Sequence, residues 1–231
     1  MNRRNVVLFA FVCACLCVAS FAFTFDLGIG IKAGVVSPWY EGFDYDLFLD
    51  SFALYRQPDF GLSAGGFLTL GLAKFICIQP EAFFSMLGGR GGDEWLFLKD
   101  QATVIDLHLL LKLRFIGKRI VFYPFGGPSL FFEVGEKKFR VADKYSNTTV
   151  LTGTWVEEYI RVPVFGVTGG VGLEVPRPWV TWSVDLRYNH SLQSRFTEGS
   201  VLTDWYQKSI QLMMGLTWVV VGSGPGISRS R

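Results

Sequence analysis

Hydrophobic and polar residues alternate with a period of two along eight segments of this chain. The alternation is most regular from Thr103 to Phe115, where every odd position is large or apolar. The ionisable residues of this segment all fall on even positions, and they are Asp106, His108, Lys112 and Arg114. A β-strand points successive side chains to opposite faces, so the segment has one apolar face and one ionisable face. The pattern predicts a strand between lipid and a polar interior.

The same period predicts eight strands, each longer than the roughly 10 residues that a tilted membrane-spanning strand needs. They cover residues 26–38, 59–72, 74–87, 102–116, 120–134, 160–174, 179–192 and 208–221. The long connections are 39–58, 88–101, 135–159 and 193–207, and the three between them are short. Only a closed barrel lets strands cross lipid, and short periplasmic turns with long external loops are typical of bacterial barrels. We therefore expect an all-β, eight-stranded, antiparallel, up-and-down transmembrane β-barrel of the bacterial outer membrane, with both termini in the periplasm.

The N-terminus predicts export. Arg3 and Arg4 precede an apolar run over 6–18 and a small-residue exit at Ser20 and Ala22, which is the pattern of a secretory signal peptide. The run is at the short end for an uncleaved anchor, so we expect a signal peptide over 1–22, a barrel over 23–221 and a disordered tail over 222–231. Lipidation at Cys15 or Cys17 is an open alternative. Cys77 is then the only cysteine of the mature chain, so no disulfide is expected.

Aromatic residues gather near the ends of the predicted strands, as in the two girdles of a membrane barrel. Those near the long connections are Trp39, Tyr40, Tyr55, Trp95, Trp155, Tyr159, Trp205 and Tyr206. Those near the short turns are Phe75, Phe115, Phe122, Trp179 and Trp218. The core of a soluble sandwich is the alternative, but it explains the number of aromatic residues and not their position. Pro80, Pro124, Pro128 and Pro163 fall inside predicted strands and should mark bulges or strand ends.

The inward faces of the predicted strands hold charges of both signs. They carry Asp26, Lys32, Gln79, Glu81, Asp106, His108, Lys112, Arg114, Glu133, Glu174, Asp185, Arg187 and Gln211. An eight-stranded barrel has an interior just wide enough for side chains to fill, so we expect these groups to pair across the lumen and plug it. The alternative is a polar conduit or gate, in which Glu81, Asp106 and Asp185 exchange partners with Lys112 and Arg187.

Other chemistry finds little support in the sequence. His108 has no further ligand at metal-binding spacing, and His190 lies on the lipid-facing register, so neither a metal site nor a catalytic triad is expected. We expect no enzyme activity and no cofactor. Without Arg3 and Arg4 the basic residues only equal the 20 acidic ones, and no basic stripe indicates nucleic acid binding.

The long connections are candidates for binding an extracellular or host ligand, because loops on a rigid scaffold carry much of protein function. The candidate residues are Asp44, Asp46 and Asp50 in the first loop and Lys137, Lys138 and Arg140 in the third. A variable surface with no single ligand is the alternative.

Several stretches resemble the PorT-like outer-membrane β-barrel family, small barrels related in architecture to OmpX, OmpA and OmpW. They are Gln79-Pro80-Glu81, the run from Leu109 to Phe115, the run from Tyr123 to Pro128, and Arg187-Tyr188-Asn189 with Leu192. The chain departs from such barrels in continuing from Gly222 to Arg231 after its last strand, so Trp218 or an internal signal would serve assembly.

We also expect a monomer whose partners are outer-membrane lipid and the barrel-assembly machinery. Two functions stay open: a structural or surface-interaction barrel with a filled lumen, or a narrow channel for small or hydrophobic solutes, as in OmpW-like barrels.

Overall fold

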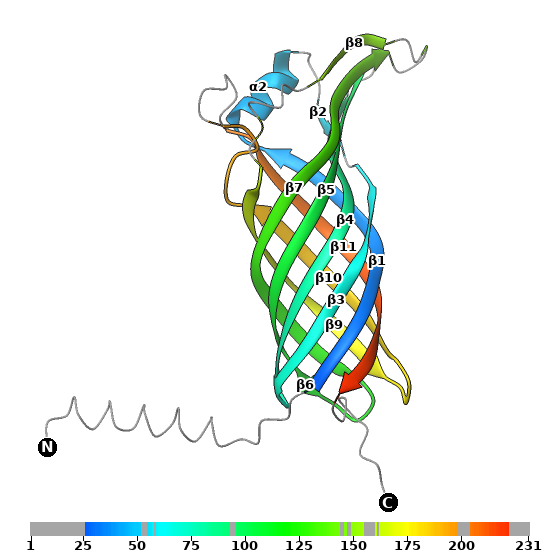
Figure 1. The fold of residues 1–231 in the computed structure, drawn as a ribbon. Coiled ribbons are helices and arrows are strands. Elements are labelled where there is room, and N and C mark those ends of the chain that lie inside the picture. The colour runs from blue at the N-terminus through cyan, green and yellow to red at the C-terminus, as the bar shows by residue number, and fades with distance from the viewer. Residues whose placement is uncertain are drawn as a thin grey trace, which may run out of the picture.

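The chain folds into a tall, closed barrel in the computed structural model (Figure 1). The structure describes residues 26–51, 55–57, 59–92, 96–143, 146, 149–154, 160, 162–197 and 204–221. The predicted signal peptide with Cys15 and Cys17, and the predicted tail over 222–231, lie outside these residues.

The secondary structure of the described residues is almost entirely strand. In chain order the elements are β1 (Asp26–Glu41), α2 (Phe43–Ser51), β2 (Tyr55–Gln57), β3 (Gly61–Ala73), β4 (Ile76–Gly92), β5 (Leu96–Leu113), β6 (Phe115–Ile116), β7 (Val121–Asp143), β8 (Thr149–Thr154), β9 (Val164–Pro176), β10 (Thr181–Ser191) and β11 (Tyr206–Val221). Among the described residues, no helix is both long and apolar enough to cross a membrane.

Hydrogen bonding closes the sheet on itself. The strands pair in the order β1, β3, β4, β5, β7, β9, β10 and β11, and β11 pairs again with β1. Every pairing along this path is antiparallel. In the described part of the chain, eight strands therefore form one closed up-and-down barrel, which confirms the fold that the alternation predicted. The short strands β2 and β8 extend the sheet beside β4 and β7.

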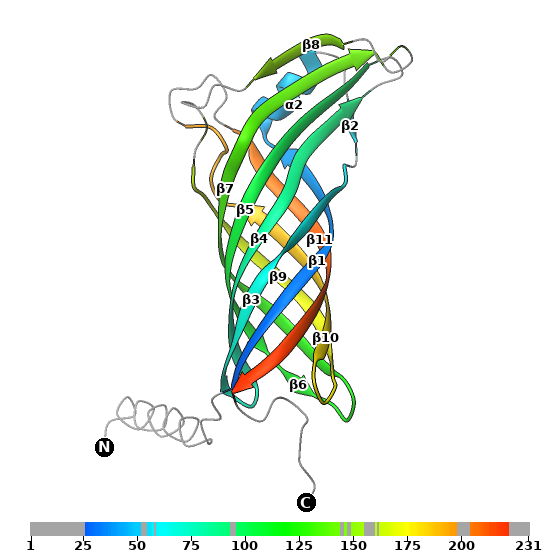
Figure 2. The ribbon, with the colours of Figure 1, turned by 45° about the vertical axis from the view of Figure 1, so that its right-hand side comes forward.

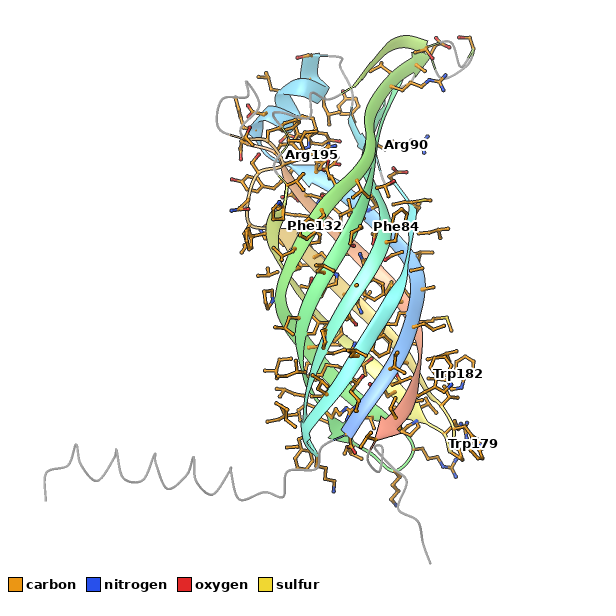
Figure 3. The ribbon with its side chains drawn as sticks, viewed as in Figure 1. Phe84, Arg90, Phe132, Trp179, Trp182 and Arg195 are labelled. Carbon is orange, nitrogen blue, oxygen red and sulfur yellow. The ribbon has the colours of Figure 1, made fainter. Side chains whose placement is uncertain are left out.

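The two faces of the wall follow the predicted alternation. From Val104 to Phe115, the inward side chains at even positions are at most 6% exposed, whereas the outward side chains at odd positions are at least 37% exposed. Figure 3 shows Trp182 directed away from the barrel, and Phe84 on the outer face of β4 is 52% exposed. Outward apolar side chains gain free energy only in lipid, so the exposed belt fits a membrane.

The two ends of the barrel differ. At one end, here called the turn end, the short connections β3–β4, β5–β7 and β9–β10 lie beside both ends of the described chain (Figure 1). At the opposite end, here called the loop end, lie α2, β2 and β8 (Figure 2). The turn end holds the exposed aromatic residues that were predicted for the short turns, among them Trp179, which is 89% exposed.

Three strands continue much further toward the loop end than predicted. β4 runs to Gly92 instead of residue 87, β5 begins at Leu96 instead of residue 102, and β7 runs to Asp143 instead of residue 134. Figure 2 shows them rising past the barrel as a sheet, with β8 and β2 at its sides. In the extension, the adjacent residues Val141 and Ala142 are both buried, so the strict alternation ends there while the backbone pairing continues. The expectation of loops over most of 88–101 and part of 135–159 was therefore wrong.

The prolines interrupt hydrogen bonding without shifting the register. The β3–β4 ladder has the same register on both sides of Pro80, and the β5–β7 ladder does so on both sides of Pro128. A missing N–H removes one bond, and the flanking bonds keep the strands aligned. The register shifts lie elsewhere, for example between Gln101 and Thr103. Pro163 does lie at a strand end, directly before β9.

Candidate functional site

The centre of the lumen holds a closed ring of two cations and two anions. Lys32 on β1 donates to Glu81 on β4 at 2.8 Å and to Asp185 on β10 at 2.6 Å. Arg187, also on β10, donates to Glu81 at 2.7 Å and to Asp185 at 2.8 Å. Each of the four side chains is at most 1% exposed. The charges balance, and each one has two opposite partners, so the ring bridges the lumen without leaving a net charge.

A second ion-pair group lies closer to the turn end and is joined to the ring. Lys112 binds Glu174 at 2.7 Å and the Gln79 amide oxygen at 3.0 Å, and its Nζ lies 3.7 Å from the centre of the Tyr123 ring. Arg114 reaches the same Glu174, with Nε 3.7 Å from Oε2. Gln79 donates to Glu81, and the Tyr123 hydroxyl donates to Asp185. The two groups form one continuous polar network.

Small residues on the inner face make room for these long side chains. A Cβ atom on Gly215 would lie 2.6 Å from Cγ of Lys32, and one on Gly172 would lie 2.6 Å from Oδ1 of Asp185. Both positions therefore require glycine because the network occupies the space that a side chain would need. The small residues that the sequence places on the inner faces allow large polar ones to cross the lumen.

Aromatic rings line the cations of the ring. The Arg187 guanidinium lies 5.3 Å from the Phe83 ring and 5.5 Å from the Phe125 ring, and Lys32 Nζ lies 4.6 Å from the Phe67 ring. Cations this close to aromatic faces gain additional electrostatic stabilisation. The network is thus both neutralised and tightly enclosed.

The next layer toward the loop end is polar but carries few charges. The Asp106 carboxylate accepts a hydrogen bond from Ser85 at 2.6 Å, and Ser85 contacts Ser63 at 2.7 Å. His108 Nδ1 lies 3.0 Å from the Thr168 hydroxyl. Thr168 donates on to Asn189, and Asn189 donates to Ser209, so this chain of bonds crosses from β5 to β11.

An apolar layer and an aromatic cap follow. The apolar layer consists of Val36, Leu87, Ala102, Val104, Phe131 and Val164. In the cap, the Trp205 ring packs edge-on against Tyr45 at 4.8 Å, Phe196 at 5.3 Å and Tyr40 at 5.7 Å. Arg195, labelled at the loop end in Figure 3, pairs with Glu133 at 2.7 Å. The lumen is therefore filled by side chains from the ion pairs up to the mouth.

Helix α2 is fixed over the mouth by a reciprocal contact with Asp204. The Phe43 amide donates to the Asp204 carboxylate at 2.8 Å, and the Asp204 amide donates to the Asp44 carboxylate at 2.7 Å. Gly42 before the helix has φ +135°, and a Cβ there would lie 2.1 Å from the Asp204 carbonyl oxygen. The turn into the helix thus requires glycine.

The predicted lumen residues all lie inside the barrel. Lys32, Glu81, Asp106, His108, Lys112, Arg114, Asp185 and Arg187 are buried. The observed partners differ from those of the alternative gate. Glu81 and Asp185 bind Lys32 and Arg187, Lys112 binds Glu174, and Asp106 binds Ser85.

The predicted loop residues lie on regular elements. Asp44, Asp46 and Asp50 belong to α2, where a loop was expected, and Lys137, Lys138 and Arg140 belong to the extended β7. The expected loop-end girdle is corrected at Tyr40 and Trp205, which are fully buried in the cap. Trp95, Trp155 and Tyr159 lie outside the described residues. Sequence reasoning missed Arg195 and the cap, whose only signal was the cluster of Tyr and Trp in two separate loops.

Two hollows remain. One is a pit of about 20 Å³ at the turn end, lined by Asp26, Thr69, Arg114 and Glu174 among others, and it has room for about one water molecule. The other is a groove of about 650 Å³ on the lipid-facing wall over β1, β3, β4 and β5. Among the described residues, no group of three or more His, Cys, Asp and Glu side chains is arranged to hold a metal ion.

The chain is similar to a known family of membrane barrels. The model of the outer membrane protein beta-barrel domain matches residues 20–197. The chain belongs to this family. Its location is therefore the bacterial outer membrane, as predicted. The more specific resemblance to the PorT-like family stays a prediction. No curated protein matches the chain.

Three solved structures of outer-membrane barrels are similar to the chain. OprG of Pseudomonas aeruginosa has a TM-score of 0.47 and 12% identity, covering 85% of this chain and 96% of its own. Neisserial surface protein A has a TM-score of 0.44 and 11% identity, and the match covers 82% of this chain and 96% of its own. Ail of Yersinia pestis, solved with the heparin analogue sucrose octasulfate, has a TM-score of 0.39 and 11% identity. The match covers 84% of this chain and 99% of its own.

Proposed function

We propose that this outer-membrane barrel has a plugged lumen and acts through the surface that it displays at its loop end. The turn end then faces the periplasm and the loop end faces the exterior, as the lengths of the connections indicate. The observation that carries the proposal is the buried ring of Lys32, Glu81, Asp185 and Arg187.

The ring is costly to open. A solute that passes through the lumen would have to separate Arg187 or Lys32 from both of its carboxylate partners. Breaking a buried ion pair by removing one partner costs about 3–5 kcal/mol, because the remaining charge stays buried without compensation. The apolar layer and the aromatic cap lie above the ring. These successive layers support a structural filling of the lumen over a gate.

The surface at the loop end is large and regular. The extended parts of β4, β5 and β7, with β2 and β8 at the edges, form a sheet beyond the barrel (Figure 2). Beside it α2 exposes Asp46 and Asp50. Sheet and helix are held by backbone pairing and by the cap, so they are a rigid platform for contact with an extracellular or host partner. A monomer suffices for this role, and it needs no cofactor and no catalysis.

Planar-bilayer conductance tests the plugged lumen. The refolded protein should give no stepwise current, while flotation with vesicles and a heat-modifiable gel mobility confirm that it has inserted. Stepwise currents from inserted protein would contradict the proposal.

Binding at the loop end is tested separately with the double variant Asp46→Asn/Asp50→Asn, which should weaken attachment of the purified barrel to an extracellular ligand. Trp182→Phe, on the lipid-facing wall, is the matched control and should leave attachment unchanged.

A second candidate function, passage of hydrophobic solutes, rests on the groove in the lipid-facing wall. The groove is lined by outward residues such as Ile31, Leu68 and Leu107, and it extends to Glu81 and His108, which belong to the lumen. It lies over the position where Pro80 interrupts the β3–β4 ladder. The substitution Leu68→Trp would fill the groove, and it should slow uptake of an aromatic hydrocarbon into vesicles that contain the protein. Equal uptake with and without the substitution would eliminate this candidate.

A further inference from the structure

Exposed cations surround the turn end. Lys74 lies in the β3–β4 turn, Lys118 and Arg119 lie in the β5–β7 connection, and Arg177 lies in the β9–β10 turn. All four side chains are exposed, and in the described part of the chain none of them forms an ion pair. The three connections are spaced two strands apart around the barrel, so the cations are distributed along its rim.

The carboxylates near this end do not neutralise the rim. Glu174 is buried and bound to Lys112 and Arg114, and Asp26 is half-buried beside the pit in the lumen. The sequence has no acidic residue before Asp26 or after Asp204. Each of the three short connections therefore contributes positive charge to the rim.

Three of the four cations have an exposed aromatic or aliphatic neighbour that belongs to the lipid-facing belt. Lys74 Nζ lies 5.7 Å from the Phe75 ring, Arg119 precedes Ile120, and Arg177 is two residues from Trp179. Figure 3 shows Trp179 at this end of the wall. Exposed aromatic residues at strand ends lie at the level of the lipid headgroups. The cations next to them are thus held at the height of the phosphates.

We propose that this rim of Lys74, Lys118, Arg119 and Arg177 binds the headgroups of anionic phospholipids in the adjacent leaflet. The ligand class is a phosphodiester headgroup with a net negative charge, such as phosphatidylglycerol. A soluble polyanion fits less well, because the cations follow the circumference beside lipid-facing rings and do not converge on the pit. In the orientation proposed above, the leaflet is the periplasmic one, but binding itself does not depend on that orientation.

The test uses the full-length mature barrel in phosphatidylcholine nanodiscs that contain either spin-labelled phosphatidylglycerol or spin-labelled phosphatidylcholine. The wild-type protein should enrich the anionic lipid in its immediate shell over the neutral one. Because a basic residue near an anionic surface contributes about a fivefold preference, each of Lys74→Gln, Lys118→Gln, Arg119→Gln and Arg177→Gln should reduce the enrichment by up to roughly that factor. The quadruple variant should abolish it, and high salt should weaken it in the wild type.

The matched control is Arg90→Gln, which removes one exposed cation at the loop end. It should leave the enrichment unchanged, and heat-modifiable mobility should show that every variant still forms the barrel. Equal enrichment in the wild type and the quadruple variant would overturn the proposal. So would an equal loss in Arg90→Gln, or displacement of the labelled lipid by soluble glycerol phosphate, since the latter would indicate a site for free phosphates.

Discussion

The lumen is filled in two ways, by ion pairs toward the turn end and by aromatic rings at the loop end. The ion pairs lie at the level of the outward apolar belt, where every buried charge has to be neutralised by a partner. The cap lies at the mouth, where ring packing dominates and the Arg195–Glu133 ion pair lies beside the rings. The difference suggests that the first region fixes strand positions across the barrel, whereas the second closes it. The two regions should therefore respond differently to substitution.

Removal of Arg187 should have the largest effect. The substitution Arg187→Met leaves Glu81 and Asp185 with Lys32 as their remaining cation in the ring. We expect the free energy of unfolding to fall by about 3–5 kcal/mol, because a buried carboxylate loses its partner. Urea-induced unfolding in vesicles, followed by tryptophan fluorescence, measures the change. The exposed Arg90→Met is the control, and a loss no larger than in that control would show that the ring does not hold the barrel together.

Removal of the centre of the cap should have a smaller and more local effect. In Trp205→Ala, the packing against Tyr40, Tyr45 and Phe196 is lost. We expect a local loss of about 3 kcal/mol, the lower value for truncating a large buried aromatic residue. Limited proteolysis should then cleave the loop end faster while the barrel keeps its heat-modifiable mobility. Barrel unfolding with no earlier cleavage would contradict separate regions.

Overpacking of the ion-pair region should cost less again. In Gly215→Ala, the new methyl group would approach Lys32 Cγ and Ser183 Oγ to 2.6 Å. Extra volume in a well-packed interior costs about 1–3 kcal/mol, measured by the same unfolding experiment. Gly169→Ala is a matched control, because the nearest atom to its Cβ would be 3.8 Å away. Equal stabilities of the two variants would show that the space around Lys32 is not limiting.

The smallest effect should come from the ion pair at the rim of the loop end. Lys208 binds Glu41 between β11 and β1, and the two side chains are 18% and 37% exposed. Water and salt screen such a pair, so Lys208→Gln should reduce the free energy of unfolding by about 0–1 kcal/mol. The difference from wild type should shrink at high salt. A loss as large as that of Arg187→Met would mean that burial does not separate the two regions.

The alternation of side chains was sufficient to predict the barrel. The run from Thr103 to Phe115 has a period of two with its ionisable residues on one face, which indicates a strand between lipid and a polar interior. The inward position of Lys32, Glu81 and Arg187 followed from the same periodicity. The pattern also predicted where the membrane-level parts of all eight strands lie.

The partners within the lumen could not be predicted, because pairing depends on register and on strands distant in the sequence. Lys32 and Asp185 are 153 residues apart. The extended sheet was missed because the strict alternation ends before β4, β5 and β7 do, for example at the adjacent buried residues Val141 and Ala142. The cap was missed because its rings come from separate connections, and only folding brings Tyr45 beside Trp205.

The pairing of β1 with β11 has a consequence for how the protein is made. Leu27 pairs with Val221, so the first and last strands of the barrel lie side by side although most of the chain separates them in sequence. Until β11 has docked against β1, the sheet has two open edges whose backbone groups have no partner, and lipid offers none. Contacts between strands so distant in the sequence carry a large entropic cost of loop closure, so the β1–β11 pairing is the most demanding contact of the barrel to form. A chain that ends before β11 would remain an open sheet that the cell has to shield or destroy.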